Sequence, residues 1–419
     1  MDNTGVPQYK QSISRLKGLQ PYVSSKDLKR FVENIGIEPG SSRRGNLALI
    51  IECINSRQNI EDQEKVINGF NSFFLNQLKS KNRVVGISYF GLQKGKFAES
   101  PQEFAEEFFD GSVSGCSIFQ SDPSSKIFTP VYHKIISTDD SEAIKCVQII
   151  YSKIYFTKDD MAKDPKENHV EFVRINFDVQ NNEVQFYFPY PKTNTGKEHH
   201  STFAVYERLS KKILSDFKVQ LMSPDTEQQV FNIYKKFTED NELEYVEKLN
   251  VVDSEKGNSK ALEFYNSIVT EFDSSLKSIP SESYVERIKR VFIRLYIDQY
   301  FETFVTNIKK STGYITGFIY KDLLGSSITG KNSTGKSLDD QEIDPLQASD
   351  TYLDTRDTIF MSEKLFSVRV KMRLSDGTWM RREVRFTAYH NLITIHFISD
   401  PISEENKDYV LQQFRAIIQ

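Results

Sequence analysis

The sequence predicts an α+β protein built from several domains. Its 419 residues exceed what one hydrophobic core usually organises. Apolar residues recur every three or four positions at the amino end and over 203–311, whereas they alternate between these regions and near the carboxyl end. We therefore expect a helical N-terminal unit (1–82), a mixed, β-rich α+β middle domain (83–222), a helical connector (223–312), and a C-terminal unit (313–419) with a small antiparallel β-sheet and a helix.

Helices are predicted first and strands second along the amino-terminal half. Within 61–79, Val66, Phe70 and Phe74 share one broad apolar face, which is typical of a core helix. The spacing of the apolar residues changes at Arg83, and a strand is expected from Val84 to Phe90. Pro101 then opens a short helix.

The middle region predicts strands and one clear hairpin. Strand-like runs span 127–136 and 144–156. The runs 170–177 and 184–188 flank a short polar turn, which indicates an antiparallel hairpin.

The region from Phe203 to Ser311 is expected to be mainly helical. Residues 283–310 contain neither Gly nor Pro, and their apolar side chains nearly encircle a helix, so we expect one long helix that is buried on several sides. A strand is expected over 314–320. The composition of 325–358, rich in Gly, Ser, Thr, Asp and Lys, predicts a flexible loop.

The C-terminal unit predicts three strands and a helix. Residues 366–374 alternate, Asp376-Gly377 supplies a turn, and 379–386 returns. A third strand is expected over 392–398, followed by a closing helix that starts near Pro401.

Composition and cysteine usage indicate a cytoplasmic protein. The net charge is −4, and 31 Phe and 20 Tyr residues supply ample apolar surface for packed domains. The three cysteines are odd in number and widely spaced, which argues against a disulfide framework or a zinc site. No apolar run approaches a membrane span, so no membrane association is expected.

A basic region near the amino end resembles a DNA-binding module. Residues 10–57 contain nine Lys or Arg and four Asp or Glu residues. Residues 24–37 predict an N-capped helix that ends at Gly36, and 46–54 predict a second helix. Over 23–54 this pattern resembles the helix-extension-helix of SAP-like modules; the alternative is a helical hairpin with a solvated basic face. The resemblance implies phosphate contacts by Lys26, Lys29, Arg30, Arg43 and Arg44.

The C-terminal hairpin predicts a second basic surface. Alternation places Val368 and Val370 on one face and basic residues on the other. With an exposed tryptophan, such a ribbon can follow a phosphate backbone and stack a base. The alternative is a solvated strand whose charges discourage aggregation. The candidate contacts are Arg369, Lys371, Arg373, Trp379, Arg381 and Arg385.

Residues 330–337 match the phosphate-loop pattern G-x-x-x-x-G-K-[ST]. In a nucleotide site, Gly335, Lys336 and Ser337 would contact the phosphates and Mg²⁺. The flanks argue against this, because polar residues precede the string and acidic residues and Pro345 follow it. A further alternative is that Lys331 and Lys336 contact a nucleic-acid backbone from a loop.

No enzyme class is indicated by the remaining residues. The six histidines show no metal-binding spacing, and no nucleophile motif is present, so no metal or other cofactor is expected and enzyme activity is left undecided. His390 and His396 lie near the basic hairpin and are the acid–base candidates.

The leading expectation is a non-enzymatic protein that binds DNA or RNA through the two basic regions. One alternative is a protein-interaction or scaffold subunit of a multi-protein complex. The other is a nucleotide-dependent enzyme or nuclease that uses residues 330–337.

Overall fold

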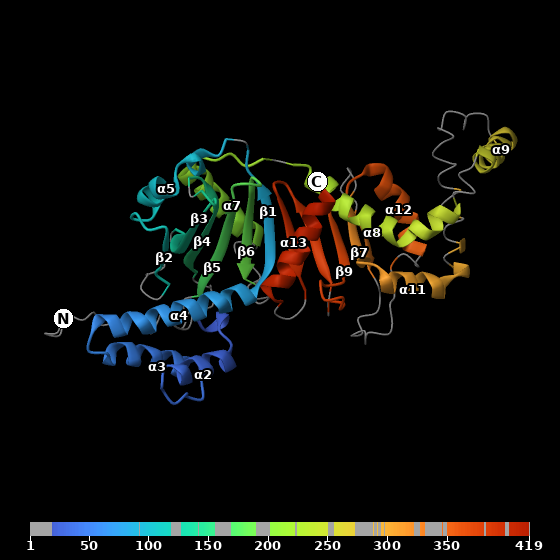
Figure 1. Cartoon of the computed structure of the whole chain (residues 1–419). Coiled ribbons are helices and arrows are strands. Elements are labelled where there is room, and N and C mark those ends of the chain that lie inside the picture. Colours follow the sequence, from blue (N-terminus) through green and yellow to red (C-terminus); the bar gives the residue numbers. More distant parts are fainter. Residues whose placement is uncertain are drawn as a thin grey trace, which may run out of the picture. The chain divides into compact units, whose positions relative to one another are not determined.

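Antiparallel strands with helices packed on them make up both halves of the molecule (Figure 1). The computed structural model describes residues 19–91, 93–118, 127–140, 142–155, 169–189, 202–222, 224–249, 255–272, 288, 291, 295–296, 298–321, 327–331, 346, 350–380, 383–398 and 402–418. Unit 1 comprises residues 1–224 and 400–404, and unit 2 comprises residues 225–399 and 405–419. The predicted α+β class is confirmed.

Unit 1 combines helices with antiparallel strands, which follow the order β2-β3-β4-β5-β6-β1. The helix expected over 61–79 and the hairpin expected over 170–188, formed by β5 and β6, are confirmed. The elements are η1 (Gln20–Tyr22), α2 (Ser25–Asn34), α3 (Arg43–Ser56), α4 (Ile60–Lys81), β1 (Asn82–Tyr89), η2 (Gly95–Ala98), α5 (Pro101–Phe108), β2 (Ser114–Cys116), β3 (Thr129–Ser137), β4 (Ile144–Tyr155), β5 (His169–Asp178), β6 (Glu183–Pro189) and α7 (Thr202–Phe217).

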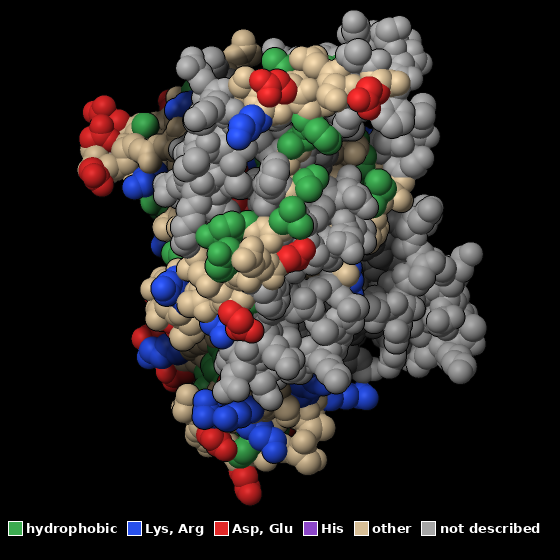
Figure 2. All heavy atoms as spheres, turned by 90° about the vertical axis from the view of Figure 1, so that its right-hand side faces the viewer, with side chains coloured by type: hydrophobic (Ala, Val, Ile, Leu, Met, Phe, Trp, Pro, Cys, Tyr) green, Lys and Arg blue, Asp and Glu red, His purple; other side chains and the backbone are tan. Residues whose placement is uncertain are grey.

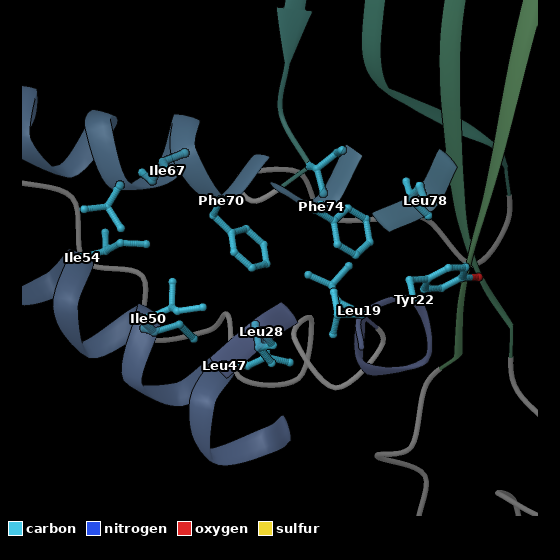
Figure 3. Close-up of a cluster of buried hydrophobic side chains, with 14 of the residues drawn as sticks. Leu19, Tyr22, Leu28, Leu47, Ile50, Ile54, Ile67, Phe70, Phe74 and Leu78 are labelled. Carbon is cyan, nitrogen blue, oxygen red and sulfur yellow. The ribbon is translucent and has the colours of Figure 1, made fainter. Parts of the chain in front are cut away.

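The amino-terminal helices share one hydrophobic core with part of this sheet. Figure 3 shows Phe70 and Phe74 of α4 pointing toward Leu28 of α2 and Leu47 of α3. The ring of Phe74 also lies edge-on to Phe172 of β5, with centroids 5.2 Å apart. Aromatic packing therefore holds α4 to β5, and α2 and α3 join the same core through α4.

The opposite face of the unit 1 sheet is covered by α5, η2 and α7 through an aromatic cluster. Phe217, at the end of α7, lies 5.2 Å from Phe97, 5.6 Å from Phe104 and 5.3 Å from Phe177 of β5, measured between ring centroids. The helix α5 begins where expected, because Ser100 and Glu103 form a capping box before and inside its first turn.

The strands of unit 2 are antiparallel and follow the order β11-β10-β9-β7-β8. Phe386 stacks on Phe414 of α13, and Phe318 meets Tyr234 of α8 edge-on. Phe318 and Phe386 lie opposite Val368 on either side of β9, so both helices cover the same face. The elements are α8 (Thr226–Leu249), α9 (Glu255–Phe272), α11 (Phe301–Lys310), β7 (Gly313–Lys321), β8 (Ser327–Lys331), α12 (Asp350–Ser362), β9 (Ser367–Met372), β10 (Val384–Tyr389), β11 (Leu392–Phe397) and α13 (Glu404–Ile418), whose first residue belongs to unit 1.

Two expectations for unit 2 differ from the structure. The single long helix over 283–310 is wrong: Tyr300 has non-helical dihedrals before α11 begins, and Val291 and Leu295 are 59% and 58% exposed. The region 325–358 contains β8 and α12, so its described part is not a loop. The polar composition predicted a loop because β8 is an edge strand that exposes most of its side chains, and such a strand can be as polar as a loop.

Each unit contains an arginine–carboxylate pair with a buried arginine, and in unit 2 the carboxylate is buried as well. In unit 1, Arg174 contacts Glu404 at 2.9 Å, and its guanidinium carbon lies 3.7 Å from the centroid of the Tyr187 ring. In unit 2, Arg356 of α12 donates to Glu242 of α8, and their side chains are 9% and 3% exposed. Such pairs fix the partners strongly, because removing one member leaves a buried charge.

Truncation of Phe217 is expected to destabilise unit 1 strongly. Phe217→Ala removes a side chain that is 2% exposed and contacts four other aromatic rings, so the free energy of unfolding should fall by about 3–5 kcal/mol. Ile60→Ala is the control, since Ile60 is 52% exposed and its loss should cost less than about 0.5 kcal/mol. Chemical denaturation followed by circular dichroism measures both; equal costs would contradict the packing argument.

The pair Arg356–Glu242 predicts strongly non-additive mutations. Arg356→Met alone leaves the Glu242 carboxylate buried without its guanidinium and should cost about 3–5 kcal/mol. The double variant with Glu242→Leu should recover most of that loss, because no buried charge remains. A double-mutant cycle from denaturation curves measures the coupling energy, and additive costs would show that the pair is not coupled.

Candidate nucleic-acid interface

The strand register of unit 2 aligns basic residues across the sheet. Arg369 of β9 lies opposite Arg385 of β10, which in turn lies opposite His396 of β11. On the other side of β9, Gly317 of β7 lies opposite both Arg369 and Lys331 of β8. Directly paired residues share a face of a sheet. We call Lys331, Arg369 and Arg385 the cationic row; His396 lies beside Arg385 at its end.

The alternation predicted for the hairpin is confirmed. Val368, Val370 and Met372 are buried on the face that the helices cover, whereas Arg369 and Lys371 are only partly buried. The return strand differs from expectation, since β10 begins at Val384, and Trp379 forms only an isolated bridge with Arg373. Arg381 lies outside the described residues.

A carboxylate compensates Arg369 of the cationic row. Glu383, just before β10, accepts from Arg369 with 2.9 Å between Oε1 and Nη1, and from Thr316 with 2.6 Å between Oε2 and Oγ1. Arg385 donates from Nη2 to Nδ1 of His396 over 3.2 Å. Arg369 and Arg385 face each other directly, so the Glu383 carboxylate offsets part of the repulsion between them.

Trp379 and Arg373 do not form an exposed stacking surface. The ring of Trp379 is half-buried and packs edge-on against Tyr314, with centroids 5.5 Å apart. Arg373 lies over the Trp379 ring at 5.1 Å and donates to the carbonyl of Lys309 in the last turn of α11. The expectation of a free aromatic is therefore wrong: Trp379 packs beside the core cluster of Phe304 and Ile308, and Arg373 binds a helix end, where a cation is favourable.

The amino-terminal basic residues lie on unit 1. Lys26 and Arg30 of α2 and Arg44 of α3 are exposed, and Lys29 is half-buried. Hydrogen bonding from the Ser24 hydroxyl lowers the pKa of Asp27, with smaller contributions from Gln77, Arg30 and Lys26, so a carboxylate stays ionised among these cations. The two predicted basic surfaces thus belong to different units.

Arg43 has a structural role within this region. Its Nη1 donates to the carbonyl of Gln20 at 3.0 Å and to that of Val23 at 3.4 Å. The sequence pattern marks Arg43 and Arg44 as equivalent, but only the fold shows that Arg43 holds the segment before α2.

The described part of the phosphate-loop string lacks the geometry of a nucleotide site. Gly330 and Lys331 pair with Phe318 and Gly317 as the end of an antiparallel strand, whereas a phosphate loop follows a parallel strand. Gly335, Lys336 and Ser337 lie outside the described residues. Within the described ranges, no group of His, Cys, Asp and Glu is arranged to hold a metal ion, and no helix is long and apolar enough to span a bilayer.

The sequence patterns single out every member of the row, but not the residues that pair with Arg369. Candidates from the sequence include Lys331, Arg369, Arg385 and the neighbouring His396. Glu383 and Thr316 are not among them, because their contact depends on a register shift in β7 between Ile315 and Gly317. No protein-family model matches the chain, and no curated protein shows significant similarity to it.

Arg43→Ala should lower stability, whereas Arg44→Ala should not. The first change removes two hydrogen bonds from a charged donor to the carbonyls of Gln20 and Val23, at a cost of about 1–2 kcal/mol. The second removes an exposed side chain from the next position of the same helix. Thermal melts of the two variants provide the comparison, and equal melting temperatures would show that the Arg43 contacts contribute nothing.

Proposed function

We propose that the protein binds the phosphate backbone of DNA or RNA through the cationic row of unit 2. The observation that carries this proposal is the register, which sets Arg369 directly opposite Arg385 and continues the same line to Lys331. Neighbouring strands are about 4.8 Å apart, so the line offers cations at short intervals across one face of the sheet.

Arginine is well suited to this role. Its planar guanidinium donates two parallel hydrogen bonds to a phosphate, and such charge-assisted bonds are stronger than neutral ones. An incoming phosphate also relieves the repulsion between Arg369 and Arg385. Figure 2 shows Lys and Arg interspersed with Asp and Glu on the side of the molecule that carries α9, so the attraction must come from local order and not from net charge.

The amino-terminal basic helices supply a second contact surface in this proposal. Lys26, Lys29, Arg30 and Arg44 project from α2 and α3, the segment that resembles SAP-like modules. Backbone contacts of this type are independent of nucleotide sequence, so the proposed binding is non-specific.

A protein-interaction role is the second candidate, and exposed apolar side chains favour it. Leu262 and Phe264 of α9 are 40% and 58% exposed, and Val291 and Leu295 are exposed by more than half. Large apolar side chains that gather on a surface often mark contact sites for other proteins.

Reversal or removal of a positive charge in the row should weaken nucleic-acid binding. Lys331→Glu changes an exposed residue at the end of β8, and Arg385→Gln removes a central cation. Each change should lower affinity and reduce the slope of log K against log salt by about 1, because one phosphate contact is lost. Fluorescence anisotropy with labelled single-stranded and duplex DNA and RNA, between about 50 and 200 mM salt, measures both quantities.

Lys65→Glu is the matched control for this experiment. Lys65 lies on α4 with its side chain 67% exposed, and the change alters net charge equally without touching the row. If affinity falls equally in Lys65→Glu and Lys331→Glu, the loss is caused by the change in net charge and not by the row. A wild-type protein that binds no nucleic acid at low salt would refute the proposed function.

A further inference from the structure

We propose that Glu383 is an internal competitor for phosphate, which occupies Arg369 in the free protein and must be displaced when a nucleic acid binds. This inference rests on the proposed function of the cationic row. It adds a regulatory element to that surface, namely a carboxylate that lowers the affinity of the row for phosphate.

Glu383 holds Arg369 in the way that a phosphate would. Its Oε1 lies 2.9 Å from Nη1 of Arg369, a normal length for a charge-assisted hydrogen bond. The two side chains are 23% and 22% exposed, so the pair is partly shielded from solvent but still open to a ligand. A phosphate oxygen that reaches Arg369 must replace the Glu383 oxygen at this position.

A bulge in β7 positions the competing carboxylate. Ile315 lies opposite Val370 and Gly317 opposite Arg369, so Thr316 is the extra residue in the pairing with β9. The Thr316 hydroxyl donates to Oε2 of Glu383 over 2.6 Å. Both carboxylate oxygens are therefore engaged, one by the cation and one by the bulge.

The Arg369 side chain passes over Gly317 of β7. A Cβ atom at Gly317 would lie 3.4 Å from Cδ of Arg369, which is an ordinary contact distance. The Arg369 stem therefore reaches from β9 toward β7, where Thr316 and the Glu383 carboxylate meet. The same guanidinium is thus placed to serve either Glu383 or a ligand phosphate.

Electrostatics favours release of Glu383 when phosphate binds. A carboxylate and a phosphate that share one guanidinium repel each other at close range, so both cannot keep full contact with Arg369. Exchange of one charge-assisted hydrogen bond for another costs little at a partly exposed site. The net effect of Glu383 is then to weaken binding without preventing it.

Glu383→Gln tests this inference. Glutamine keeps the size of the side chain and an acceptor for Thr316 but lacks the charge. Affinity for single-stranded DNA should rise roughly three- to fivefold at about 150 mM salt, and the salt slope should steepen by about 0.7, as expected for one additional phosphate contact. Circular dichroism melts verify that the variant is folded.

Glu239→Gln provides a matched control in the same unit. Glu239 pairs with Lys235 on α8, and its side chain is 54% exposed, so the change removes one carboxylate from an ion pair outside the row. A larger gain for Glu383→Gln than for Glu239→Gln supports the inference. Equal gains, or a loss of affinity in Glu383→Gln, overturn it while the proposed function stands; a wild-type protein without any binding at low salt refutes the proposed function itself.

Discussion

The hydrogen-bond register of the unit 2 sheet determines where every residue of the cationic row lies. Because side chains alternate between faces, a slip of one residue would turn Val368 and Phe386 away from α8 and α13 and bring Arg369 to the helix side. Burial of each large apolar side chain contributes about 1.5–3 kcal/mol. The repulsion between Arg369 and Arg385 costs about 0.2–1 kcal/mol. Apolar packing therefore fixes a register that holds two cations together.

Local patterns in the sequence predict the elements well but not their pairing. The spacing of Val66, Phe70 and Phe74 defines α4, and the alternation around Val368 and Val370 defines β9, because both depend on residues close in the chain. The pairing of Gly317 with Lys331 and Arg369 depends on a bulge at Thr316, which no local pattern encodes. The alignment that creates the row was for this reason beyond sequence-based prediction, although its members were named individually.

Counting basic residues overestimates how many are free to meet a ligand. Arg43 holds the carbonyl of Gln20, Arg373 holds that of Lys309, and Arg356 is paired with Glu242 inside unit 2. Each guanidinium has several donors, so a folded chain readily uses arginine to satisfy carbonyls and carboxylates that would otherwise be unpaired. The charges left on the surface are a selected subset, and only the fold identifies them.

The glycines near the phosphate-loop string illustrate the same difference between a pattern and its cause. A Cβ atom at Gly330 would lie 2.5 Å from the ring of Phe318, so the strand can pass this ring only with glycine. A Cβ atom at Gly317, opposite Lys331, would lie 3.1 Å from the carbonyl oxygen of Gly330, which is a tight contact between the paired strands. Packing of an antiparallel pair therefore accounts for Gly330 and favours a small residue at Gly317, and neither requires a nucleotide. The place of Lys331 is set by its strand, since it extends the line of Arg369 and Arg385. Its contribution to the proposed anion binding depends on β8 remaining paired with β7.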